Sequence, residues 1–422
     1  DADVLDEMDK IRVSMSLWKD KNDGEYFNIQ SKMHLGEIVF DYMGIPALSQ
    51  TDKGKNQFDD TAIEMLSKQF DWAKQLRVYN RLLKISSTYV DRFLDKQEDG
   101  RYYFYYKQHG TISGRYGSDA QQLPKPKEEG DDDPIVVEYT NRVRAFFVSG
   151  EGRKLVDCDY ESLEPHVFAS VSTDKGIQEI FSNGWDFYST IAIKTEKLTG
   201  VSPDKKADNY LKKVDPSKRQ SAKGYSLGIP YGMSPYALGK TLNISTKKAK
   251  ALVQGYLDGF PSLAEWMEAS KAQVKEYGFI KNKVGRIRHL DKVKKLYDTF
   301  GEGLLDWKTR KDLEAQYGGE VVTNWYRDYK NGLNNAMNFQ IQSMAAAIVN
   351  RAAIQINRKF KEMGVNGGVQ AQVHDQLIMN VPEADAERCS VVVQEIMENI
   401  LELEGVTLKA PPEVAINWKD GH

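Results

Sequence analysis

The stretch Val369-Gln370-Ala371-Gln372-Val373-His374-Asp375-Gln376-Leu377-Ile378-Met379-Asn380-Val381 decides how the rest of the chain is interpreted. Apolar and polar residues alternate before His374-Asp375, and a mostly apolar run follows, which is typical of two β-strands joined by a tight turn. The carboxylate of Asp375 would stand at the tip of this hairpin. Judged alone, such an Asp is as readily a turn residue as a functional one.

A second carboxylate ends another predicted strand. The segment 153–159 rises into a short apolar strand and ends at Asp159. Ser162 is predicted to cap a helix that runs through Ala169, with Pro165 in its tolerant first turn. Metal-dependent phosphoryl transfer needs carboxylates on rigid elements that hold two cations ~3.5–4 Å apart. Asp159 and Asp375 are therefore candidate metal ligands.

The segment 218–232 strengthens this interpretation. Its residues Arg219, Lys223, Leu227 and Tyr231 recur every four positions, so a helix would place them on one face, with the cations at one end. Such a face could bind a triphosphate and pack on a base or sugar. Pro230 lacks an amide hydrogen, so we expect the last turn to be loosened before Tyr231.

Composition excludes several classes of protein. The 422 residues contain 41% apolar residues, 58 Lys and Arg, 61 Asp and Glu, and only two Cys. This length suffices for about three domains. No apolar run approaches the ~20 residues of a membrane span, and two Cys cannot form a disulfide framework or a Cys-rich zinc site.

The pattern of apolar and polar residues predicts helices over 3–96 and 340–360, a strand around 102–106 and a long irregular loop over 110–134.

The segments around Asp159, around Arg219 and Lys223, and around Asp375 together resemble motifs A, B and C of the family A DNA polymerases, in the right order. The resemblance rests on Asp159-Tyr160-Glu161-Ser162-Leu163-Glu164, on Arg219, Lys223, Gly228 and Tyr231-Gly232, and on Val373-His374-Asp375. Three further segments resemble the same family: Thr111-Ile112-Ser113-Gly114-Arg115, Asn338 to Gln342, and Asn417-Trp418. The resemblance to this family therefore covers nearly the whole chain.

The resemblance implies a fold and a division into domains. The fold would be α+β, a right-hand polymerase fold with an antiparallel-sheet palm, helical fingers and a helical thumb. The expected domains are a thumb-like helical subdomain over 1–100, a first part of the palm with motif A over 101–182, fingers with motif B and an extra insertion over 183–333, and a second part of the palm with motif C over 334–422.

The resemblance also implies roles for single residues. Asp159, Asp375 and the backbone carbonyl of Tyr160 would hold two Mg²⁺ ions, for which Mn²⁺ could substitute. Lys223 would be catalytic as a general acid toward pyrophosphate. The dNTP would meet Arg219, Lys223, Leu227, Tyr231, Glu164 and Tyr188, and the primer–template DNA would meet Arg115, Asn338, Gln342 and His374.

Several positions depart from the family pattern. Leu227 replaces the usual aromatic residue, Gln376 replaces the Glu that commonly follows the motif C Asp, and Tyr188 stands where a triphosphate-contacting His is common. His166 and Asn334 each replace an expected Arg. The segment between His289 and Asn334 is longer than usual, and we expect an added fingers element there. This divergence suggests a phage-like origin.

The implied activity is template-directed DNA synthesis. A primer 3′-hydroxyl would attack a dNTP with release of pyrophosphate, without a proofreading exonuclease in this chain. We expect a monomer in the cytoplasm of a bacterial or phage-infected cell, with no membrane partner.

Three alternatives remain open. Glu164 argues against a single-subunit RNA polymerase because it would exclude a ribose hydroxyl. The intact Asp159, Asp375 and Lys223 argue against an inactive nucleic-acid-binding relative. His374-Asp375 also suggests an HD-phosphohydrolase, but none of the other five of the six His precedes an Asp.

Overall fold

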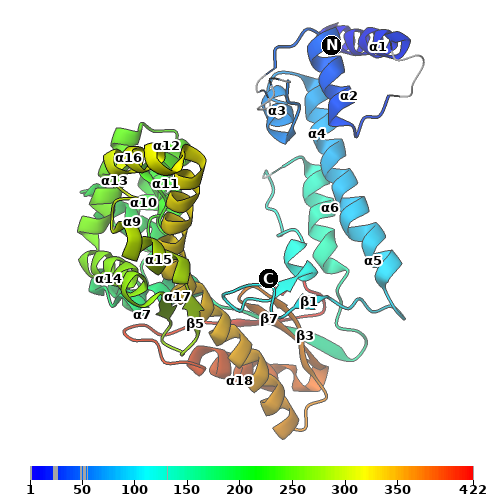
Figure 1. Ribbon diagram of the computed structural model, residues 1–422. Coiled ribbons are helices and arrows are strands. Elements are labelled where there is room, and N and C mark those ends of the chain that lie inside the picture. Colours follow the sequence, from blue (N-terminus) through cyan, green and yellow to red (C-terminus); the bar gives the residue numbers. More distant parts are fainter. Residues whose placement is uncertain are drawn as a thin grey trace. The chain divides into compact units, whose positions relative to one another are not determined.

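The computed structural model describes residues 2–21, 27–47, 50, 54, 56–130 and 132–421. They form two compact units (Figure 1). The first combines residues 1–103 with 123–147, and the second combines 104–122 with 148–422. No helix within the described ranges is both long and apolar enough to cross a membrane.

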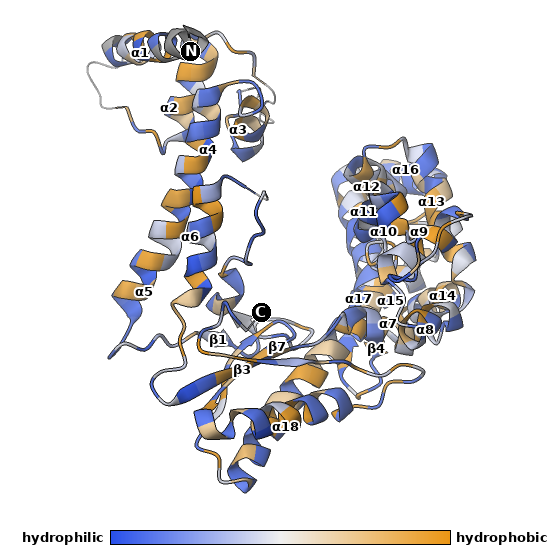
Figure 2. Ribbon diagram, turned by 180° about the vertical axis from the view of Figure 1, so that it is seen from behind, coloured by the Kyte–Doolittle hydropathy of each residue, from blue (hydrophilic) through white to orange (hydrophobic). Residues whose placement is uncertain are grey.

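The first unit is helical, as the sequence predicted for residues 3–96. Figure 2 shows hydrophobic and hydrophilic residues alternating along its helices α4 and α6, so each helix can bury one face. The buried core consists of Leu35, Val39, Phe58, Ala62, Ile63, Leu66, Ala73 and Leu76. The elements are α1 (Ala2–Lys21), α2 (Lys32–Gly36), the π-helix Glu37–Tyr42, α3 (Asp60–Leu66), α4 (Asp71–Lys84), the π-helix Ile85–Val90, α5 (Asp91–Lys96) and α6 (Pro134–Ala145).

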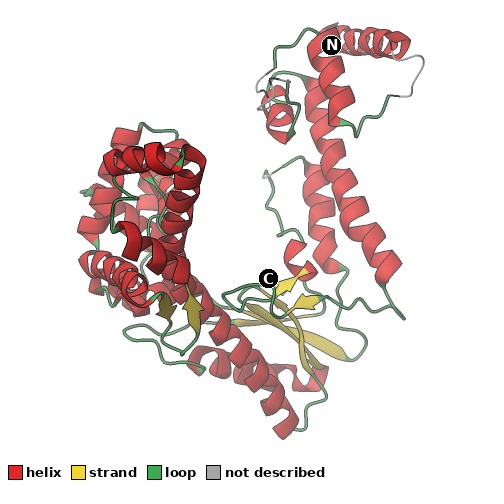
Figure 3. Ribbon diagram, in the orientation of Figure 1, coloured by secondary structure: helices red, strands yellow, loops and turns green. Residues whose placement is uncertain are grey.

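The second unit contains a four-stranded antiparallel sheet with the strand order β6-β7-β3-β8. Figure 3 draws its strands in yellow, together with the shorter strands of the unit. Its strands are β3 (Arg153–Asp159), β6 (Gly368–Val373), β7 (Gln376–Pro382) and β8 (Pro412–Ala415). The predicted strand ending at Asp159 and the predicted hairpin around Asp375 are confirmed. The predicted strand at 102–106 is only partly present, since the observed strand β1 begins at its last residue (Tyr106–Lys107). Its partner β2 (Gly117–Ser118) lies inside the segment 110–134 that was expected to be irregular.

Two helices, α17 (Gly319–Glu362) and α18 (Ala386–Asn399), share one hydrophobic core with the central strands. Val156 and Cys158 of β3 and Leu377 and Met379 of β7 are fully buried in that core. The predicted helix 340–360 is confirmed, but it is the end of a 44-residue helix. The strand residues that alternate with the core positions, including Asp157 and Asp159, therefore lie on the other face of the sheet.

The remaining helices lie mainly between β3 and α17 in the chain. The segment 289–334, expected to be an added element, contains helices over 291–300 and 307–317 and the beginning of α17. These helices share a core that includes Val293, Leu296, Leu304 and Tyr329. The elements of this unit not yet given are the 3₁₀ helices Asp119–Gln122 and Glu383–Asp385, α7 (Leu163–Ser172), α8 (Lys175–Ser182), α9 (Phe187–Glu196), α10 (Leu211–Val214), α11 (Pro216–Tyr225), α12 (Pro235–Leu242), α13 (Thr246–Gly259), α14 (Pro261–Tyr277), β4 (Phe279–Lys281), β5 (Ile287–His289), α15 (Asp291–Phe300) and α16 (Trp307–Tyr317).

The prediction that Ser162 caps the helix after β3 is wrong. Ser162 precedes α7, but its backbone is left-handed, with φ 54°, and its side chain makes no capping hydrogen bond. Its carbonyl instead accepts hydrogen bonds from the backbone amide of His166 (3.1 Å) and from the His166 ring (2.9 Å). A capping Ser needs an extended backbone to aim its hydroxyl at the first turn, and the sharp turn after β3 does not allow one.

Candidate active site

The two predicted metal carboxylates lie at neighbouring strand ends. Asp159 ends β3 and is paired in register with Gln376, the first residue of β7. Asp375 directly precedes Gln376, in the two-residue turn between β6 and β7. Antiparallel partners are ~4.5–5.5 Å apart at Cα. The register alone therefore brings the two Asp residues together at one end of the central strands β3 and β7, which are labelled in Figure 1. This end of the two strands is here called the sheet edge.

The turn between these strands requires an unusual backbone at His374. Its φ is +59°, in the left-handed region, and its side chain is exposed. Asp375 is less exposed, and burial raises the pKa of its carboxyl group. Glu164 raises that pKa further, whereas His374 and Arg115 lower it. Because burial disfavours the charged carboxylate of Asp375, a nearby positive charge would stabilise it.

Tyr160, the third predicted metal ligand, has a buried side chain that is engaged elsewhere. Its hydroxyl donates a hydrogen bond to the carbonyl of Met397 in α18, at 2.8 Å. Burial raises the pKa of this phenol far above its usual value. Any role of Tyr160 at the sheet edge is thus left to its backbone.

Glu164 connects two other predicted site residues. One carboxylate oxygen accepts a hydrogen bond from the Tyr231 hydroxyl at 2.8 Å, and the other is ion-paired with Arg115. Burial, followed by the charge of Glu164, raises the pKa of Tyr231. Motif A, the 111–115 loop and the end of motif B therefore meet at one carboxylate.

Of the four residues predicted to share one helical face, only the two cations, Arg219 and Lys223, lie in a regular helix. Helix α11 ends at Tyr225, so Leu227 and Tyr231 lie in turns beyond it. The expected loosening at Pro230 thus begins earlier than predicted. The carbonyl of Ser226, to which Pro230 cannot donate, accepts a hydrogen bond from the buried hydroxyl of Tyr256 at 2.9 Å.

Arg219 is held by a residue that the sequence did not reveal. Its Nε and one terminal nitrogen donate to the two carboxylate oxygens of Asp186, at 2.8 and 2.9 Å. Asp186 also caps α9 by accepting from the Ser189 amide at 2.8 Å. The only sequence signal for Asp186 was its position as a possible helix cap.

The two cations of α11 both lie near one aromatic ring. The Arg219 guanidinium carbon is 5.4 Å from the ring centroid of Tyr188, and the Lys223 amine is 6.0 Å from the same centroid. Both distances are in the range of cation–π attraction. Lys223 is otherwise exposed, so its amine can reach an anionic ligand.

Helix α17 carries the remaining predicted contacts. Asn338 and Gln342 are four positions apart and so share one face of the helix. Asn334, one turn before Asn338, donates to the carbonyl of Gly232 at 3.3 Å. Gly232 has a φ of +85°, and an added Cβ would collide with the Asn334 side chain. Asn334 therefore fixes the backbone just after Tyr231.

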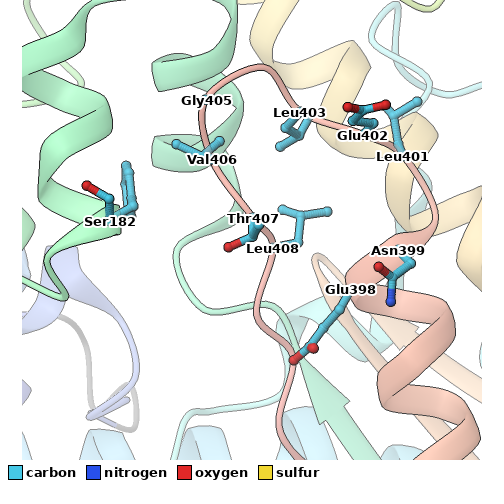
Figure 4. Close-up of a pocket in the computed structure, with 11 residues that line it drawn as sticks. Ser182, Glu398, Asn399, Leu401, Glu402, Leu403, Gly405, Val406, Thr407 and Leu408 are labelled. Carbon is cyan, nitrogen blue, oxygen red and sulfur yellow. The ribbon is translucent and has the colours of Figure 1, made fainter.

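A pocket of about 610 Å³ is lined by other residues. Figure 4 shows it between Ser182, at the end of α8, and the chain from Glu398 to Leu408. None of the predicted site residues lines it. The candidate active site is thus the sheet edge formed by Asp159 and Asp375 rather than this pocket.

The chain is similar in sequence to known proteins along most of its length. It is 28% identical to DNA polymerase I of Pseudomonas aeruginosa over 405 residues, 94% of this chain and 39% of that protein. It is 27% identical to the thermostable DNA polymerase I of Thermus aquaticus over 398 residues, 94% of this chain and 42% of that protein. It therefore spans about two fifths of the length of these relatives.

Among solved structures, the fold resembles the POL domain of Pol1 from M. smegmatis, in complex with DNA primer-template and dNTP. The TM-score is 0.73 at 25% identity, over 99% of this chain and 66% of that one. The predicted α+β right-hand polymerase fold is thereby confirmed. The family described as DNA polymerase family A matches residues 7–420. The chain belongs to DNA polymerase family A.

Proposed function

We propose that this chain is a template-directed DNA polymerase that adds dNTPs to a primer 3′-hydroxyl and releases pyrophosphate. The observation that carries the proposal is the register of β3 and β7, which places Asp159 and Asp375 at one sheet edge. The carboxylate of Glu164, which accepts from Tyr231, supports a deoxyribose site beside them.

Family A polymerases use divalent metal ions. Asp159 and Asp375 fit two Mg²⁺ ions, because Mg²⁺ is usually bound through one or two carboxylates together with water and substrate phosphates. Tyr160 would add its backbone carbonyl, and Mn²⁺ could substitute. When bound, the ions would lower the pKa of the attacking hydroxyl and neutralise charge on the phosphates.

The cationic residues of α11 would orient the triphosphate. Arg219, fixed by Asp186, presents a positioned guanidinium, and the exposed Lys223 can reach the leaving pyrophosphate and donate a proton to it. The ring of Tyr188 lies within cation–π range of both cations. Leu227 and Tyr231 would border the base and the sugar.

Primer–template DNA would contact Arg115, His374, and the α17 face of Asn338 and Gln342. We further propose that residues 1–100 act as a thumb, 101–182 and 334–422 as the palm, and 183–333 as the fingers. The monomeric state, the cytoplasmic location, the phage-like origin and the lack of exonuclease activity stay predictions.

The decisive experiment is primer extension with four parallel reactions: a DNA or an RNA template, each with dNTPs or NTPs, in Mg²⁺. We expect extension of the primed DNA template with dNTPs, and none when EDTA replaces Mg²⁺. Preferential use of NTPs would favour the RNA polymerase alternative. Primer–template binding without extension would favour the inactive relative.

A further inference from the structure

The residue after Asp375 is paired with a buried carboxylate. Gln376 and Asp157 are each 3% exposed. The Gln376 side-chain amide lies 2.8 Å from one carboxylate oxygen of Asp157 and 2.7 Å from the other. Gln376 stands where the family commonly has Glu, so this contact belongs to a departure of this chain from the family pattern.

The pair lies directly behind the two metal carboxylates. Gln376 follows Asp375 in the chain and is in register with Asp159 across the strands. Asp157 is two residues before Asp159, on the same face of β3. Asp157 and Gln376 are thus diagonal neighbours across the β3–β7 pair, a spacing at which side chains on one face interact.

The chemistry of the two side chains is matched. An amide donates to a carboxylate, and such a charge-assisted bond is stronger than a neutral one. A Glu at 376 would place a second carboxylate against Asp157 in a buried site, where like charges repel strongly. Gly421 closes over Asp157, because an added Cβ there would lie 3.1 Å from the Asp157 Cβ. The carboxylates would therefore have little room to separate.

We infer that Asp157 and Gln376 form a positioning pair that holds the ends of β3 and β7 together and so sets Asp159 and Asp375 for cation binding. This inference rests on the proposed function for the identity of the cation. Neither residue of the pair is a metal ligand in this inference. Restoring the family's Glu at 376 would therefore damage this particular site.

The test is a double-mutant cycle with Mn²⁺ affinity measured by electron paramagnetic resonance. The variants are Gln376→Glu, Asp157→Asn, and the exchange Asp157→Asn with Gln376→Glu, in which an Asn amide would donate to the Glu carboxylate. Coupled neighbours interact by ~0.5–3 kcal/mol, which is about 2-fold to 150-fold. We expect Gln376→Glu to weaken Mn²⁺ binding about 10-fold or more, and the exchange to recover most of that loss.

Asn380→Asp is the matched control. It makes the same amide-to-acid change on β7, but beside Arg153, to which Asn380 is hydrogen-bonded, and it should leave Mn²⁺ affinity within about 2-fold. Thermal unfolding of each variant separates lost binding from lost folding. If Gln376→Glu fails to fold and the exchange folds and binds, that rescue also supports the pair.

The inference is overturned if Gln376→Glu binds Mn²⁺ as the wild type does, or if the exchange variant binds no better than Gln376→Glu. Primer extension by the wild type is measured alongside. Its absence would reject the proposed polymerase activity, while the binding cycle would still decide whether the pair positions the carboxylates.

Discussion

The sheet edge and helix α11 hold their charged groups in different ways. At the edge, Asp159 and Asp375 are placed by strand register and by a core on the opposite sheet face. On α11, Arg219 is placed by one ion pair with Asp186, and Lys223 is exposed. The strands therefore fix the negative groups, through their backbone register and the inferred Asp157–Gln376 pair between them, whereas on α11 a side-chain ion pair fixes Arg219. Substitutions at the sheet edge should abolish primer extension, whereas substitutions on α11 should reduce it only partly.

Asp159→Ala and Asp375→Ala test the edge and should have the largest effect. Removing such an electrostatic element typically lowers the rate ~10²–10³-fold or more. Primer–template affinity should change little, because DNA is held mainly by many phosphate contacts. Single-turnover extension and DNA-binding titrations check both points. Near wild-type extension by either variant would reject the metal-site assignment.

Lys223→Ala and Arg219→Ala test the cationic helix. If Lys223 protonates pyrophosphate, its loss should lower kcat about 10²-fold, within the range typical of general acids. The Arg219 change should mainly raise the apparent KM for dNTP, because it removes ground-state binding. Steady-state kinetics separate the two effects. Unchanged parameters in both variants would reduce α11 to a structural role.

Glu164→Ala tests the carboxylate that connects the two regions. A ribose hydroxyl would displace Glu164 from Tyr231 and leave a buried polar group unpaired, at a cost of ~1–3 kcal/mol. That cost corresponds to about one to two decades of discrimination. The variant should accept ribonucleotides more readily, with a smaller loss of dNTP use. Competition assays with paired dNTP and NTP check this, and a wild type that uses both sugars equally would contradict it.

Asp186→Asn should have the smallest effect, and that effect should depend on pH. Burial would raise the pKa of Asp186, but hydrogen bonds from Arg219 and Ser189 outweigh it, and the pKa is lowered. A lowered pKa stabilises the fold above the unfolded value of ~3.9, and this contribution is lost as pH falls through the folded value.

At pH 7 the free energy of unfolding of the variant should therefore be ~1–3 kcal/mol lower than that of the wild type, since a partly exposed partner reduces the cost of breaking a buried pair. Thermal unfolding at a series of pH values measures the difference. The difference should shrink below pH 4. Asp215→Asn, at the half-buried N-cap of α11, is the control for losing a carboxylate that caps a helix. An Asp186→Asn deficit that is constant with pH would contradict the ion-pair account.

The sequence predicted the parts of the site that depend on local pattern. Strand alternation and the tight turn at His374-Asp375 located the sheet edge, and four-residue spacing located the cations of α11. Asp186 and the Asp157–Gln376 pair were not predicted, because their partners are 33 and 219 positions away in the chain. Periodicity carries no information about such contacts. Ser162 was mispredicted because residue type suggested a cap while the turn after β3 imposed a left-handed backbone.

The hydrogen bond from Tyr256 to Ser226 has a mechanical consequence. It joins α13 to the end of α11, and the Arg219–Asp186 pair joins α11 to the start of α9. A rotation of α11 that left either neighbour behind would break a buried hydrogen bond or an ion pair. If α11 moves when a nucleotide binds, the three helices should therefore move as one rigid body, and the hinge should lie in segments outside them.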